Sequence, residues 1–216
     1  MRYAIVGLVC LCSTILHAGD KPFVRVRWKE ATVHITYKGK AFEQNFRDAS
    51  EQRVAGKPYA RLFLADIAAL KTMYLGDKNG SVYMLLDITG PSRGPGGGSS
   101  FCGAGTESAL VLFHFDEEGE LEEPSGISYE SCISTIDPKT GEDDRPHADD
   151  ESQKIVTTFV YYRKLKDYDL RKAPPPDATG EVTVQATFDP KQPERGIMTE
   201  ETCRITQTSS PCPATQ

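Results

Sequence analysis

The chain has 216 residues, of which 38% are hydrophobic and 26% are charged, and its formal net charge is −6. This composition excludes a collagen-like or wholly disordered chain and a polytopic membrane protein, and the length predicts one domain with additions. The acidic balance argues against a general nucleic-acid binder, which carries a basic field.

The first eighteen residues have the pattern of a secretory signal peptide. Arg2 supplies a positive charge, residues 3–16 are apolar or weakly polar, and Ala18 is a small residue at the exit. The apolar run is shorter than the roughly 20 residues that a membrane-spanning helix needs. The sequence therefore predicts a signal peptide over 1–18 and a soluble, periplasmic or secreted chain from Gly19.

Alternating apolar and polar residues predict the first strands of the mature chain. The alternation covers residues 23–28 and 31–37, and a short strand is expected around 42–46. Residues 60–74 fit both a helical face and a strand, and we expect a strand that runs into a short helix. Asn79-Gly80 then predicts a tight turn, because both residues adopt positive φ.

Further strands are separated by turn residues along the rest of the chain. They are predicted at 82–88, 109–115, 126–136, 154–165 and 181–188. About eight strands at this spacing indicate a mainly β, single-domain antiparallel sandwich or flattened barrel, with at most one short helix. We expect a β domain over 19–200, with a glycine-rich loop at 90–100 and an acidic loop at 137–152, and then a disulfide-looped tail over 201–216.

Four cysteines remain after removal of the signal peptide: Cys102, Cys132, Cys203 and Cys212. An even number in an oxidising compartment predicts two disulfides, which staple the fold. Three pairings exist, and loop closure favours the local one, Cys102–Cys132 and Cys203–Cys212. No Cys-x₂-Cys or His-x₃-His spacing accompanies these residues, so a zinc site is not predicted.

Negative charge is concentrated in residues 116–151, which hold fourteen acidic residues against Lys139 and Arg145. Such an acidic flank either steers a cationic partner or is simply a solvated surface. Within it, residues 143–150 offer five oxygen and nitrogen ligands to a metal, without the Asp-x-Asp-x-Asp-Gly spacing of a calcium loop. No metal or other cofactor is predicted.

Residues 90–94, Gly-Pro-Ser-Arg-Gly, match the Gly-x-Ser-x-Gly pattern of a nucleophile elbow, with Ser92 as the nucleophile. The elbow requires a helix after the serine, and Pro95 followed by three glycines does not begin one. We therefore predict no catalytic residue and keep a secreted serine hydrolase that uses Ser92 as an alternative. A structural envelope component without catalytic activity is a further alternative.

Residues 125–129, Ser-Gly-Ile-Ser-Tyr, resemble the Ser-Gly-x-x-Tyr motif of bacterial periplasmic lysozyme inhibitors, small secreted β proteins that block the lysozyme cleft with a loop. The resemblance implies an exported binding protein, of inhibitor or immunity type, whose partner is another protein such as a cationic cell-wall hydrolase. Gly90-Pro-Ser-Arg, Cys102-Gly-Ala-Gly-Thr-Glu and Tyr129-Glu-Ser-Cys are also similar to a pattern in uncharacterised exported bacterial proteins. That similarity implies export and the Cys102–Cys132 pairing.

These motifs define an expected binding surface. A disulfide between Cys102 and Cys132 would bring the glycine-rich loop next to residues 125–129, where glycines admit the backbone of a partner. Hydrogen bonds and one aromatic anchor would then come from the candidate binding residues Ser92, Arg93, Ser125, Gly126 and Tyr129.

Overall fold

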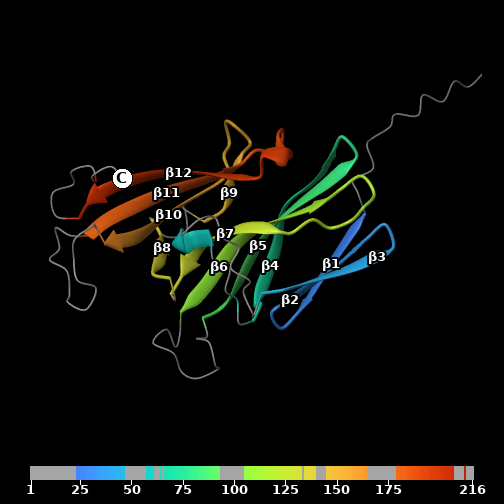
Figure 1. Cartoon of the computed structure of the whole chain (residues 1–216), viewed down its shortest axis with the longest axis horizontal. Coiled ribbons are helices and arrows are strands. Elements are labelled where there is room, and N and C mark those ends of the chain that lie inside the picture. The colour runs from blue at the N-terminus through green and yellow to red at the C-terminus, as the bar shows by residue number, and fades with distance from the viewer. Residues whose placement is uncertain are drawn as a thin grey trace, which may run out of the picture.

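The computed structural model of the protein describes residues 23–46, 57–60, 64, 66–92, 105–132, 134–139, 145–164, 179–206 and 212. Within these ranges the expected mainly β class is confirmed: twelve strands form two antiparallel sheets (Figure 1). The helical segments of these ranges are two 3-10 turns, η1 (Pro58–Ala60) and η4 (Pro193–Arg195). No helix in the described residues is long and apolar enough to cross a bilayer. The predicted signal peptide lies outside these ranges.

The N-terminal sheet contains three strands in chain order, β1 (Val24–Lys29), β2 (Thr32–Tyr37) and β3 (Lys40–Asn45). β1 and β2 were predicted from alternation, and β3 overlaps the short strand expected around 42–46. Two tight hairpins connect them, and Glu30, Lys38 and Gly39 adopt the positive φ that such turns require. Val33, Ile35 and Tyr37 are buried on one face, so the intervening residues of β2 lie on the other.

The larger sheet has nine strands. Their bounds are β4 (Ala69–Lys78), β5 (Ser81–Pro91), β6 (Thr106–Phe115), β7 (Ser125–Ser131), β8 (Ile136–Pro138), β9 (His147–Ala148), β10 (Ile155–Lys164), β11 (Thr179–Phe188) and β12 (Ile197–Ile205). Its order is β12-β11-β10-β8-β7-β6-β5-β4, and β9 pairs with β10. Among the described residues β12 and β4 are its two ends, so the sheet does not close into a barrel.

Three strand predictions need correction. We expected a strand running into a short helix over 60–74, but from Ala69 onward the chain is strand β4, which pairs along β5 with Ala69 opposite Thr89. The single strand expected over 126–136 is two strands, β7 and β8, separated by a turn in which Thr135 has φ 55°. Strand β12 was not predicted at all, and it continues past residue 200, where we expected the tail to begin.

Strands β5 and β6 are buried on both faces, which explains their unbroken apolar sequences. Even-numbered residues of β5, such as Met84 and Leu86, join a core that includes Val33 and Ile35 of the N-terminal sheet. Odd-numbered residues, such as Leu85, join a second core with residues of β10 and β11. A strand covered on both faces loses the apolar–polar alternation of a half-exposed strand.

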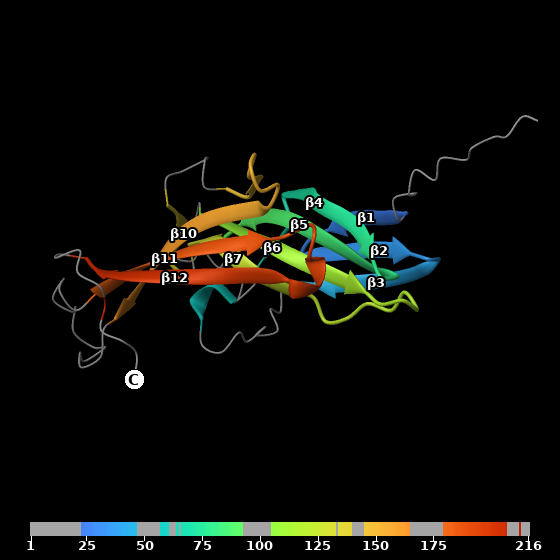
Figure 2. The same ribbon diagram turned by 90° about the horizontal axis from the view of Figure 1, so that it is seen from above.

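The molecule is therefore layered. Both views place β4–β7 between the N-terminal sheet and strands β10–β12 (Figure 1, Figure 2). Large side chains with no exposed surface fill the two cores, including Phe113 and Phe115 in the first and Phe159 and Phe188 in the second. Burying each such side chain stabilises the fold by about 1.5–3 kcal/mol.

One predicted disulfide is present, and a third cysteine is also disulfide-bonded. Cys203 of β12 pairs with Cys212, with a Cα–Cα distance of 5.3 Å. Cys132 is disulfide-bonded too. The other half of its predicted pair, Cys102, lies outside the described residues, so the Cys102–Cys132 pairing stays a prediction.

Candidate functional site

Ser92 is buried at the end of β5 and already bonded within the chain. Its side chain is 4% exposed, its backbone N–H donates to the carbonyl oxygen of Gly105, and its Oγ donates to Oε1 of the buried Glu107 at 2.7 Å. The expected role of Ser92 as a surface contact is therefore not supported, because burial removes its hydroxyl from a partner. Arg93 lies outside the described residues.

The Ser92 hydroxyl is bonded to Glu107, and the hydrogen-bond contacts of the described histidines go to groups other than Ser92. Each histidine Nδ1 lies against another group: His34 against Glu43, His114 against Glu122 and His147 against the carbonyl oxygen of Arg145. His114 is also eight residues along β6 from Thr106, the residue beside the Ser92 end of β5. That separation is about 27 Å at the rise of an extended strand. The described geometry gives the hydrolase alternative no support.

Residues 125–129 lie in a strand rather than a loop. Ser125 is exposed at the start of β7 and Gly126 is buried opposite Val111. Tyr129 is 1% exposed, and it falls at a register shift between β6 and β7, where its hydroxyl donates to Oδ1 of Asp87 at 2.7 Å. The expected aromatic anchor is thus a core residue.

The candidate residues also do not meet at one place. Ser125 is opposite Leu112 of β6, whereas Ser92 bonds to Glu107, which is opposite Ser131. The two positions on β6 are five residues apart in sequence, which corresponds to about 17 Å along the strand. The described part of the expected surface is therefore spread along a sheet instead of gathered into one contact.

A polar network surrounds Tyr129 on the face that carries the second core. Thr89 donates to Ser108, Ser108 donates to Glu130, and Arg145 lies 3.5 Å from the same carboxylate. Burial raises the pKa of Asp87, and burial together with the charge of Asp87 raises the pKa of Tyr129. The network provides these polar groups with hydrogen-bond partners within the fold. Its carboxylates do not form a metal site, because no group of three or more His, Cys, Asp or Glu in the described residues is arranged to hold an ion.

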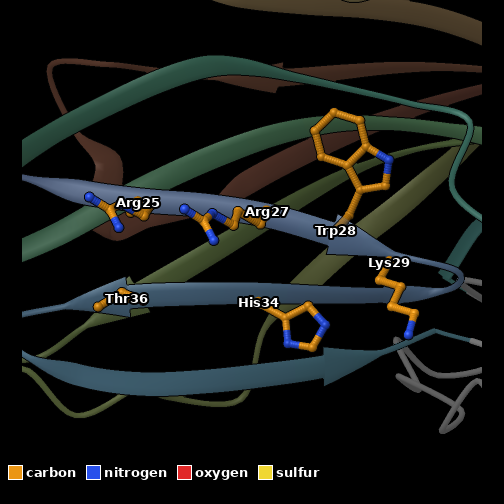
Figure 3. Close-up of a pocket in the computed structure, with 6 residues that line it drawn as sticks. All are labelled: Arg25, Arg27, Trp28, Lys29, His34 and Thr36. Atoms are coloured by element: carbon orange, nitrogen blue, oxygen red, sulfur yellow. The ribbon is translucent and has the colours of Figure 1, made fainter.

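An open basic face lies elsewhere, on the outer side of the N-terminal sheet. Strand alternation directs Arg25, Arg27 and Lys29 of β1 to that side, and register places His34 opposite Arg27 and Thr36 opposite Arg25. These residues and Trp28 line a pocket of about 370 Å³ (Figure 3). We call this set of six residues the basic face.

Trp28 gives the basic face an exposed aromatic ring. It is 43% exposed, and its indole projects from β1 on the side away from β2 (Figure 3). The Arg25 guanidinium lies 5.9 Å from the ring centroid of Phe23, which is itself 77% exposed. One exposed aromatic ring therefore directly precedes β1 and another lies near its end, and the outer face between them is cationic.

Within the described ranges, the three cations of β1 have no acidic partner. None of Arg25, Arg27 and Lys29 forms an ion pair with the described residues, while His34 contacts Glu43 at 3.1 Å. Guanidinium groups are weakly hydrated and hydrogen-bond carboxylates and phosphates through a planar fork. The arrangement can therefore bind an anionic group, with Trp28 as an apolar contact beside it.

The sequence carried a signal for this face that our predictions did not use. The run Arg-Val-Arg-Trp-Lys over 25–29 places cations at every second position, which in a strand means one side.

Comparison with protein-family models, with curated proteins and with solved structures finds no match for this chain.

Proposed function

We propose that the protein is an exported binding protein that recognises an anionic partner through the basic face. The observation that carries the proposal is the line of three cations without acidic partners among the described residues, placed beside an exposed tryptophan. Arginine and tryptophan are the residues that most often dominate binding energy at protein interfaces.

The chemistry of the basic face favours binding over catalysis. It offers hydrogen-bond donors and positive charge, and the Glu43 carboxylate on the neighbouring strand is engaged by His34. Fixed cations attract and orient an anion, and they do so at long range, so association should be fast and should slow as salt is added.

The test uses Trp28, which is the only tryptophan of the chain, so that indole fluorescence reports on the site itself. A titration with polyglutamate should change the fluorescence, and the double variant Arg25→Ala/Arg27→Ala should weaken binding at least about tenfold. The matched control is Arg195→Ala/Arg204→Ala, which removes two exposed arginines outside the face. Equal binding by both double variants would contradict the proposal.

A second candidate function rests on the turn between β6 and β7. Residues 116–123, which we call the acidic turn, expose Glu117, Glu118 and Glu120. Lysines of the β2–β3 hairpin fix this turn: Lys38 donates to the Glu117 carbonyl oxygen, and Lys40 contacts the Glu118 carbonyl oxygen and the Glu120 carboxylate. A fixed acidic turn supports the inhibitor or immunity-type proposal, in which the partner is a cationic cell-wall hydrolase.

That candidate is tested by cell-wall lysis with c-, i- and g-type lysozymes in the presence of the mature protein. Inhibition should weaken in Glu117→Lys/Glu118→Lys and should be unchanged in Glu181→Lys/Glu200→Lys, which reverses two charges on β11 and β12. Full lysis at a large molar excess of the protein would remove the inhibitor proposal.

A further inference from the structure

We infer that the free edge of β1 takes up an acidic segment of the partner as an added β-strand, an inference that rests on the proposed function of the basic face. In the described residues β2 is the only strand paired with β1, since the N-terminal sheet has the order β1-β2-β3. In an antiparallel pair, alternate residues of each strand direct their N–H and C=O groups away from the neighbour. Those groups of β1 form a template for one more strand.

The side chains of β1 specify the charge pattern of that strand. Arg25, Arg27 and Lys29 follow one another at about 7 Å on the outer side, which is the repeat of alternate residues in any strand. A strand added beside β1 in register therefore presents every second side chain to one of these cations. Glutamate or aspartate at those positions forms cross-strand pairs with them.

Trp28 specifies the residues between the carboxylates. Its position has the opposite parity to the three cations, and its ring projects past the edge of β1 where the added strand would lie (Figure 3). An apolar side chain at an intervening position would cover the indole. The recognised segment thus alternates acidic and apolar residues.

The same cations disfavour pairing of this edge with a second copy of β1. A second copy of β1 at this edge would place arginine against arginine, and like charges directly across a strand pair are unfavourable. Charged residues on an edge strand prevent indiscriminate pairing in this way. An acidic strand is the one that gains both the backbone hydrogen bonds and the charge pairing.

The experiment compares three peptides of identical sequence with alternating glutamate and valine. One is unmodified, one carries backbone N-methyl groups on the glutamates and one carries them on the valines. Only one set of amides can face β1, so one methylated peptide should bind the full-length mature protein like the parent and the other should bind at least about tenfold more weakly. Binding is followed by the fluorescence of Trp28 and by calorimetry.

Other outcomes overturn the strand proposal and are distinguishable from failure of the proposed function. Equal binding of all three peptides, still lost in Arg25→Ala/Arg27→Ala, would mean charge recognition without strand addition. Binding of inorganic polyphosphate but of no peptide would assign the face to a non-protein polyanion. If neither the peptides nor polyphosphate nor polyglutamate binds, the proposed function itself falls.

Discussion

Asp87 is a carboxylate that the fold buries beside Tyr129, and its ionisation works against folding. Burial raises its folded-state pKa above the ordinary value of 3.8, although the hydrogen bond from Tyr129 opposes that shift. Because the folded state holds the proton more tightly, the favourable contribution of Asp87 is complete below its unfolded pKa and is lost as the pH rises through the folded pKa. The hydrogen bond from Tyr129 favours the ionised form of Asp87, and the charges of Lys71 and Arg145 act in the same direction.

We predict that Tyr129→Phe lowers the free energy of unfolding by about 1.5–3 kcal/mol at neutral pH, because it removes a hydrogen bond to an ionised group. The loss should be smaller at acidic pH, where Asp87 is protonated in the folded state. Urea unfolding at both pH values measures the difference. Tyr162→Phe, at a 47% exposed position of β10, is the matched control and should change little.

Asp87→Asn separates the charge from the hydrogen bond. The amide oxygen still accepts a hydrogen bond from Tyr129, but the side chain at position 87 no longer ionises. The free energy of unfolding of the variant should therefore lose the dependence on acidic pH that Asp87 contributes. Tyr129→Phe should then cost less in the Asp87→Asn background than in the native protein. An identical cost at both pH values and in both backgrounds would show that the Asp87 charge plays no part.

Among the strands, β5 depends on a glycine for a close backbone approach. A Cβ at Gly90 would overlap the carbonyl oxygen of Asp66, where the segment before β4 crosses and Ala68 donates to Thr89 at 2.9 Å. We expected the glycines of this region to admit a partner, but Gly90 admits the chain itself. Gly90→Ala should lower the free energy of unfolding by about 1–3 kcal/mol through overpacking.

Thermal unfolding of Gly90→Ala beside Gln185→Ala, an exposed position of β11, checks this expectation. The control should stay within a few tenths of a kcal/mol of the native protein, in line with surface substitutions in general. A stable Gly90→Ala variant would mean that the 66–68 segment moves aside without loss.

The Cys203–Cys212 bridge closes a short loop and should contribute accordingly. With a sequence separation of nine residues, the loop-entropy argument gives about 2–3 kcal/mol for Cys203→Ser/Cys212→Ser. The predicted Cys102–Cys132 bridge would close a longer loop, so its removal should cost more. Chemical denaturation of the two double variants ranks them, and the reverse order would contradict the prediction.

Strands could be predicted from the sequence where burial leaves a regular pattern of apolar residues. They could not be predicted where burial leaves no such pattern. β1, β2 and β11 alternate because one face of each is covered, and β5 and β6 are continuously apolar because both faces are covered. β12 is a polar edge strand with Glu200 and Glu201 exposed, so its sequence resembles a loop. β4 contains a bulge between Thr72 and Tyr74, which breaks period two and imitates a helical spacing.

The candidate site was less predictable than the fold. Burial of Ser92 and Tyr129 depends on which strands cover β5 and β7, and strand order cannot be derived from the pattern of one strand. The basic face was visible as alternating cations, but only the position of β1 at an edge makes those cations a candidate binding surface.

At the scale of the whole molecule, β5 and β6 connect the two cores, because neighbouring residues of one strand belong to different cores. Leu85 packs toward β10 and β11 and Leu86 toward the N-terminal sheet, and both are fully buried. Loss of packing on either face therefore loosens strands that the other core also needs. We predict that the N-terminal sheet and the larger sheet unfold in one cooperative transition.

Two adjacent substitutions test this coupling. Leu85→Ala and Leu86→Ala should each lower the free energy of unfolding by about 2–5 kcal/mol, the usual range for emptying a buried leucine site. Trp28 fluorescence reports on the N-terminal sheet, and far-ultraviolet circular dichroism reports on all strands. In both variants the two signals should shift together along the denaturant axis. If Leu85→Ala moved only the circular dichroism transition and left that of Trp28 in place, the N-terminal sheet with β4–β6 would be an independent folding unit, since the second core could then be lost without it.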